Sequence, residues 1–241
     1  MFAKKKSPPM PIDWKGHCER LSYQVQEPKL KEFYQAFNTP AHAPVRQVEF
    51  LALDLETTGL DPQNDHILSI GFLTLSHDRI FCDRSRHWIV QPEEQPENAQ
   101  STIHGITHST LASCPAFGDT LIHLLRAMAG KVIIAHYSRI EREFLNQATL
   151  DCIGEPLEFP VIDTMELESR KHPIYRPNFI QRWMGDKNSP SLRMSHARER
   201  YGLPRYRPHH ALTDALSTAE LFLAQMADQF SPDTPVGQLW L

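Results

Sequence analysis

A regular pattern of apolar residues organises the chain from about residue 48 onward. Residues 48–55 read Val-Glu-Phe-Leu-Ala-Leu-Asp-Leu and are apolar on both faces, which is typical of a strand in the middle of an α/β sheet. Residues 67–75 and 80–90 predict two further strands, joined by a hairpin turn at 76–79. Three consecutive strands predict an antiparallel start to the sheet.

Helical and strand patterns alternate in the rest of the chain. Apolar residues recur at helical spacing over 115–129 and 211–230. Shorter helices are expected at 139–148, 164–170 and 192–201, with short strands at 132–135 and 160–162. We therefore expect an α/β fold in which one mixed sheet, antiparallel in its first three strands and parallel afterwards, is flanked by helices.

The first 45 residues differ from the rest. They are polar and interrupted by prolines, and only 30–37 has the spacing of a short helix. We expect residues 1–45 to be a partly helical N-terminal extension and 46–241 to be one domain, with a basic insertion near 170–208.

The composition is that of a globular protein. Apolar residues make up 41% of the 241 positions and charged residues 22%, which excludes disorder as the main state. No apolar run approaches the roughly 18 residues of a membrane helix, and Ser7-Pro8-Pro9 stands where a signal peptide would be apolar. The four cysteines lack zinc-ligand spacing. We expect a cytoplasmic protein with no membrane contact.

The charge is unevenly distributed. The chain carries a net charge of −4, yet 170–208 holds ten Lys and Arg residues against two acidic ones. Aromatic residues that could stack on bases (Tyr175, Phe179, Trp183) alternate there with Arg176 and Arg182. This pattern is consistent with a nucleic-acid path, or with a solvated loop that has a few packing anchors.

Asp54 and Glu56 are the first candidates for chemistry. Being two residues apart at the end of a strand, their side chains leave the same face of the sheet. Two carboxylates on a face that is otherwise apolar repel each other and are costly to bury, and a divalent cation would remove both problems. The alternative is that the strand has already emerged into water.

Glu141 lies within the apolar stripe of its predicted helix. At 100° per residue it shares one side with Phe144 and Leu145, whereas Glu143 points to solvent. A lone glutamate in that position is destabilising unless something pairs with it. A ligand role, a buried ion pair and an early exit to the surface all remain open.

His209 and Asp214 come at the start of the last predicted helix. Asp214 lies in its first turn, where the helix dipole favours an acid, and His209 comes just before it. Taken singly, they read as a capping acid and a surface histidine.

Taken in order, four segments resemble the DEDDh 3′–5′ exonucleases, a family that includes the proofreading epsilon subunit of bacterial DNA polymerase III and oligoribonuclease. The resemblance runs from about residue 48 to 228. The four segments are 54–60 (Asp-Leu-Glu-Thr-Thr-Gly-Leu), 103–107 (Ile-His-Gly-Ile-Thr), 135–145 (Ala-His-Tyr-Ser-Arg-Ile-Glu-Arg-Glu-Phe-Leu) and 209–215 (His-His-Ala-Leu-Thr-Asp-Ala).

The resemblance implies a ribonuclease H-like fold and a site with two Mg²⁺ or Mn²⁺ ions. By position, Asp54, Glu56 and Asp214 would be metal ligands, with Asp54 bridging, and His209 would be the general base. Two such ions can bind the scissile phosphate, activate a water and stabilise the leaving oxygen.

The same resemblance assigns the substrate contacts. Thr57, Thr58 and Leu60 would hold the 3′-terminal nucleotide, and His104 would lie in the loop that packs on it. One position departs from the family, because the second motif usually carries Asp where this chain has Glu141. The asparagine that usually follows the histidine of that motif is Tyr137 here.

We therefore expect a metal-dependent 3′–5′ exonuclease that acts on single-stranded nucleic acid with a free 3′ end, with DNA favoured, and releases nucleoside 5′-monophosphates. One alternative is an oligoribonuclease-like enzyme for very short substrates. Another is a non-catalytic module that binds nucleic acid or a polymerase on the same fold. A polymerase or a second copy of the chain is a possible partner.

Overall fold

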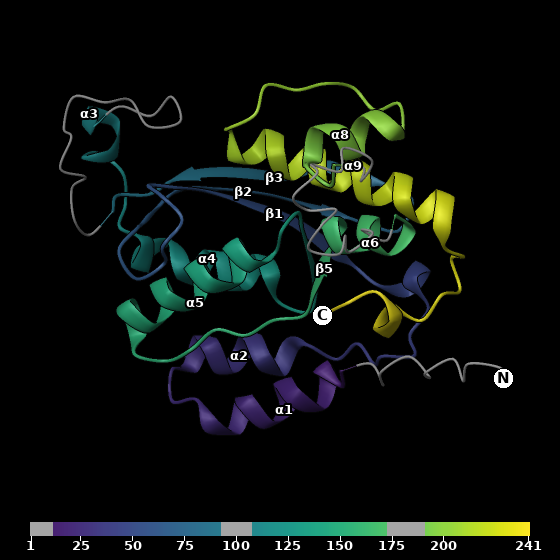
Figure 1. Ribbon diagram of the computed structural model, residues 1–241. Helices are drawn as coiled ribbons and strands as arrows, with labels where there is room; N and C mark the ends of the chain where they lie inside the picture. Colours follow the sequence, from purple (N-terminus) through teal and green to yellow (C-terminus); the bar gives the residue numbers. More distant parts are fainter. Residues whose placement is uncertain (1–11, 93–107, 173–190) are drawn as a thin grey trace, which may run out of the picture.

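The computed structural model describes residues 12–92, 108–172 and 191–241 (Figure 1). A five-stranded sheet with the order β3-β2-β1-β4-β5 forms its centre. The strands are β1 (Phe50–Thr57), β2 (Ile67–Leu75), β3 (Ile80–Ile89), β4 (Val132–Ala135) and β5 (Val161–Asp163).

The strand directions confirm the expected mixed sheet. β1, β2 and β3 are antiparallel to their neighbours. β4 pairs parallel with β1, and β5 pairs parallel with β4. The hairpin between β2 and β3 closes where it was predicted, with the Ser76 amide donating to the Arg79 carbonyl at 2.8 Å. β1 lies in the middle of the sheet, and its apolar residues from Phe50 to Leu53 are at most 1% exposed.

Helices cover both faces of the sheet (Figure 1). α9 packs across β1 and β2, with α6 and α8 against it, while α4 and α5 lie on the opposite face. The helices are α1 (Trp14–Gln24), α2 (Pro28–Ala36), α3 (His108–Leu111), α4 (Phe117–Met128), α5 (Arg139–Ile153), α6 (Thr164–Lys171), α8 (Met194–Arg200) and α9 (Ala211–Gln229). All the helices predicted from the sequence are present; α5 is longer than expected and ends at Gly154, whose φ is +74°.

Residues 12–45 share the core of the sheet domain. α2 confirms the predicted helix, but α1 was not anticipated. Its residues Trp14 and Cys18 are 5% and 1% exposed, and the Trp14 indole donates to the Leu241 carbonyl at 2.8 Å. The C-terminus in turn extends the sheet edge, because the Leu241 amide donates to Val161 of β5.

None of the helices in the described residues is both long and apolar enough to cross a membrane.

Candidate active site

Three carboxylates predicted to act together lie together in space. Oxygens of Asp54, Glu56 and Asp214 lie within 4.8 Å of one another. Asp54 and Glu56 come from β1, and Asp214 comes from the first turn of α9, which crosses this strand. Glu56 is 6% exposed, so β1 has not emerged into water at this point.

Burial is the largest influence on the pKa of each of the three carboxyl groups. Burial, followed by the neighbouring Glu141, Asp214 and Glu56, raises the pKa of Asp54 well above its usual range. Burial and Asp214 raise the pKa of Glu56 to about 7, although His209 opposes this shift. Burial also raises the pKa of Asp214, against the hydrogen bonds that it accepts from backbone amides. Such a group of acids is stabilised by a divalent cation.

Glu141 is buried beside this cluster. It is 3% exposed, as its place in the apolar stripe predicted, and its Oε2 has no hydrogen-bond partner within the described residues. Burial raises its pKa to about 8, and Asp163 adds to the shift. Glu143 points outward and pairs with Arg139 at 2.7 Å, as expected. Neither an early exit nor an ion pair with a described residue accounts for Glu141.

Asp163 fixes the turn that leads into the helix of Glu141. Its carboxylate accepts hydrogen bonds from the amides of Tyr137 (3.0 Å) and Ser138 (2.8 Å) and from the Ser138 hydroxyl (3.0 Å). Tyr137 has a φ of +70°, a left-handed conformation that is uncommon for a tyrosine. Such strain persists only where the surrounding structure enforces it, and Asp163 does so here.

The sequence reasoning overlooked Asp163. A readable signal was present, since an aspartate between a predicted strand and a predicted helix is a strong N-cap candidate. Asp163 does cap α6, accepting from the Met165 amide at 2.8 Å. His136 makes a structural hydrogen bond at the same turn, with its Nδ1 2.8 Å from the Thr164 hydroxyl.

His209 precedes α9 in a similar strained conformation, with a φ of +69°. Its amide donates to Asp214 Oδ2 at 2.8 Å, and the amide of His210 reaches the same oxygen at 3.3 Å. The histidine is exposed and lines a cavity together with Asp54 and Asp214. A proton acceptor is thus held at the edge of the carboxylate cluster.

Three of the four residues expected to contact substrate lie at the end of β1 and in the turn after it. Thr57 Oγ donates to the Gly59 carbonyl at 2.6 Å, and Thr58 Oγ donates to Asp65 at 2.9 Å, so both hydroxyls serve the turn after β1. Leu60 at this turn is 80% exposed. His104 lies outside the described residues.

A cavity of about 720 Å³ opens beside the cluster. Asp54, His209 and Asp214 line it together with residues of α8 and of the segments before and after that helix, among them Arg193, His196 and Arg205. Acidic and basic side chains therefore line the same cavity. Residues 173–190 of the basic insertion, with Arg176, Arg182 and Lys187, lie outside the described residues.

Comparison with known proteins identifies the family. Residues 51–222 match the family model described as Exonuclease. The chain belongs to this exonuclease family. The match includes Asp54, Glu56, Glu141 and Asp214 and leaves α1 and α2 outside it.

Two bacterial DNA polymerase III proteins are similar to this chain in sequence. The chain is 28% identical over 180 residues to the DNA polymerase III subunit epsilon of Treponema pallidum, covering 75% of this chain and 77% of that protein. It is 30% identical over 174 residues to the DNA polymerase III PolC-type protein of Thermotoga petrophila, covering 72% of this chain but only 12% of the relative. The chain thus spans a small part of the PolC-type relatives.

A solved exonuclease structure shares the fold. The nuclease domain of 3′hExo, a DEDDh family member bound to rAMP, superposes with a TM-score of 0.57 at 17% identity, covering 75% of this chain and 92% of that one. The expected ribonuclease H-like fold and the resemblance to DEDDh exonucleases are therefore confirmed.

Proposed function

We propose that this chain is a metal-dependent 3′–5′ exonuclease that removes nucleoside 5′-monophosphates from single-stranded nucleic acid, with DNA favoured. The observation that carries the proposal is the cluster of Asp54, Glu56 and Asp214 with His209 at its edge. Intact ligands argue against a non-catalytic module on the same fold. The preference for DNA is supported by the names of the polymerase relatives.

The cluster fits Mg²⁺ or Mn²⁺. Hard cations take carboxylate oxygens, which are the donors present, and the unpartnered Oε2 of Glu141 offers one more. Asp54, Glu56, Glu141 and Asp214 would hold the two ions. When bound, such ions activate a water and stabilise the charge that develops on the phosphate and the leaving oxygen.

His209 would take the proton of the attacking water. Histidine is the side chain most often used as a general base. The two backbone amides on Asp214 hold the turn of His209 to the same carboxylate that would bind the ion. The base and the ligand are thereby fixed relative to each other.

The nucleic-acid substrate would cross the carboxylate cluster from the turn after β1 to the cavity beside α8. Thr57, Thr58, Leu60 and His104 would hold the 3′-terminal nucleotide. Since the two hydroxyls are used within the turn, Thr57 and Thr58 would contribute chiefly through backbone groups and shape. Polymerase association, a second copy of the chain and a cytoplasmic location stay expectations.

Digestion of single strands labelled at the 5′ end tests the proposal. With Mg²⁺ or Mn²⁺ we expect a ladder that shortens from the 3′ end, no digestion in EDTA, and none by Asp54→Asn. Asp83→Asn, which alters an exposed acid on β3, is the matched control. Assays of DNA, RNA and dinucleotide substrates side by side distinguish the proposed exonuclease from the oligoribonuclease-like alternative. No metal-dependent shortening of any substrate would favour the binding module.

A further inference from the structure

One row of residues crosses the sheet beneath the N-terminus of α9. Gly71 of β2 lies directly opposite Asp54 of β1 on one side and His87 of β3 on the other. Directly opposed residues of antiparallel strands project to the same face. The face of this row is the one that carries Asp54, and α9 packs over it.

Gly71 lets the helix come into backbone contact with the sheet. A Cβ at this position would lie 2.1 Å from both the Ala211 carbonyl carbon and the Leu212 nitrogen. Both are backbone atoms, so no side-chain rotation could relieve the overlap. Any side chain at residue 71 must therefore displace the first turn of α9, which carries Asp214.

His87 completes the contact on the far side of Gly71. Its ring lies 4.4 Å from that of His210 between centroids, at 34° between planes. His210 caps α9, and its amide shares Asp214 Oδ2 with the amide of His209. The ring contact with His87 thus fixes His210. The amide of His210 is bonded to the proposed metal ligand Asp214, and His210 directly follows the proposed base His209.

We propose that Gly71 and His87 are positioning residues. Together they form the surface against which the start of α9 packs, here called the seat, and this surface sets the distance of Asp214 and His209 from Asp54. The inference rests on the proposed function for the roles of those three residues. Gly71 sets the depth at which the helix docks, and His87 holds the turn before it. Neither residue is among the proposed metal ligands or substrate contacts.

Mn²⁺ binding to the metal-free protein, measured by calorimetry and electron paramagnetic resonance, tests the seat. Gly71→Ala should weaken binding by about 10- to 100-fold, the usual cost of misplacing a metal ligand. Gly118→Ala is the control, because a Cβ there would meet only the Cys152 side chain, at 3.5 Å. His87→Ala should weaken binding roughly 2- to 12-fold, as expected for losing an aromatic contact. His87→Phe should restore it.

A second readout does not depend on metal or activity. Amide hydrogen exchange of His209 and His210, followed by NMR, should speed up in Gly71→Ala and His87→Ala while amides of β4 stay protected. If Gly71→Ala fails to fold, the His87 series decides.

Parent-like exchange and Mn²⁺ affinity in His87→Ala, or failure of His87→Phe to restore them, would overturn the seat. If the parent binds no Mn²⁺, the proposed function fails, and the amide exchange still reports on the seat.

Discussion

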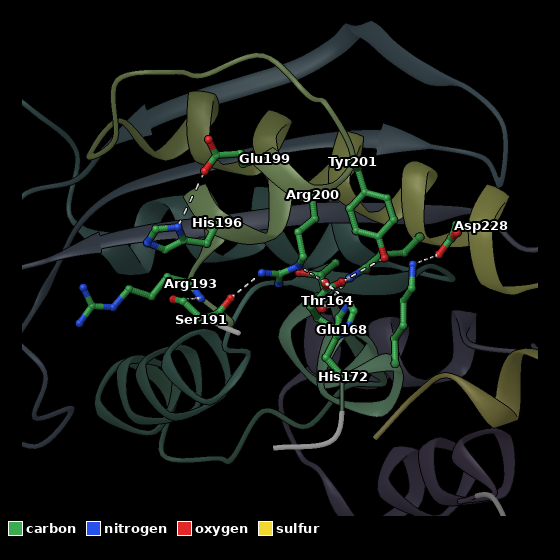
Figure 2. A network of polar contacts seen from close by, with 12 residues as sticks. Thr164, Glu168, His172, Ser191, Arg193, His196, Glu199, Arg200, Tyr201 and Asp228 are labelled. Atoms are coloured by element: carbon green, nitrogen blue, oxygen red, sulfur yellow. Dashed lines mark hydrogen bonds and ion pairs between the residues drawn. The ribbon is translucent and has the colours of Figure 1, made fainter. Parts of the chain in front are cut away.

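Buried acids occur at two places in this protein, at Glu168 and at the candidate active site, and the two places differ in the groups that surround the carboxylates. Glu168 of α6 is fully buried, at 0% exposure, and Figure 2 shows it surrounded by polar side chains from α8 and α9. Its carboxylate accepts from Arg200 (2.8 Å), Gln225 (2.9 Å) and Tyr201 (3.1 Å). Burial alone would raise its pKa, but these hydrogen bonds and the charge of Arg200 hold the pKa below its usual range.

The acids at the candidate active site have the opposite electrostatics. The pKa values of Asp54, Glu56, Glu141 and Asp214 are all raised, with burial as the largest cause of each. Glu168 is thus paired with a cation and donors from its own chain, whereas burial dominates the pKa values of the four acids at the candidate active site, a pattern typical of functional sites. The contrast separates the two kinds of site without reference to any relative.

The largest expected effect comes from Asp54→Asn. Activity should fall by roughly 10²–10³-fold or more, because the charge that holds the ions is lost. The same change removes repulsion among the acids, so the metal-free variant should melt roughly 2–4 °C higher than the parent, the shift for about 1 kcal/mol in a chain of this size. Turnover and calorimetry on one preparation measure both. A lower melting temperature would contradict net repulsion among these acids.

Glu168→Gln should do the reverse. Removing the charge of Glu168 weakens its hydrogen bonds with Arg200, Gln225 and Tyr201 and should lower the free energy of unfolding by about 1–3 kcal/mol, the cost of disturbing the partners of a buried polar group. Since the folded pKa of Glu168 is lowered, its contribution is fully present above the usual 4.5 and is lost as the pH falls through the folded value. Denaturant titrations at pH 7 and pH 3 should therefore show a larger difference from the parent at pH 7.

Substitutions of Glu141 test whether it behaves like the acids of the candidate active site or like the structural acid Glu168. Glu141→Gln should weaken Mn²⁺ affinity by roughly 10- to 100-fold, whereas Glu143→Gln on the same helix should leave it unchanged, because Glu143 pairs with Arg139 at the surface. Glu141→Asp should also lose activity, since the shorter side chain falls short. Mn²⁺ should restore part of it, being less strict in geometry than Mg²⁺. Parent-like behaviour of Glu141→Gln in both metals would exclude it as a ligand.

The sequence predicted the sheet and the directions of Asp54, Glu56 and Glu141 because both follow from the spacing of apolar residues. Alternation placed Asp54 and Glu56 on one face, and the helical period placed Glu141 inside. The cluster itself needed the crossing of α9 over β1, which no local pattern contains. Here the resemblance to a family supplied the missing link to Asp214.

Other features could not be read from local patterns. α1 has only a weak apolar stripe, and its burial depends on contacts with the distant C-terminus, such as that between Trp14 and Leu241. The close approach permitted by Gly71 likewise depends on a helix that begins 140 residues later. Local sequence rules do not report contacts of this kind, because they are set by tertiary packing.

The smallest expected effect concerns Arg193. It differs from Arg200 as the acids of the candidate active site differ from Glu168. In Figure 2 Arg200 is held within the Glu168 network, and Arg193 points away from it. Arg193 is exposed, lines the cavity beside Asp54, and its guanidinium has no ion pair within the described residues. A cation left unpaired at the wall of the cavity is available for a phosphate of the strand.

Arg193→Gln should therefore weaken binding of a long single strand and reduce the slope of log affinity against log salt by about 0.7, the value for one phosphate contact on a single strand. A dinucleotide should be affected less if the contact lies away from the 3′ end. Binding can be measured by fluorescence anisotropy over a salt series in the Asp54→Asn background, which prevents digestion. Arg84→Gln is the matched control, since Arg84 pairs with Glu49 at 3.2 Å on β3, outside the cavity. Equal slopes for both variants and the parent would mean that an unpaired arginine at this wall does not indicate the path of the strand.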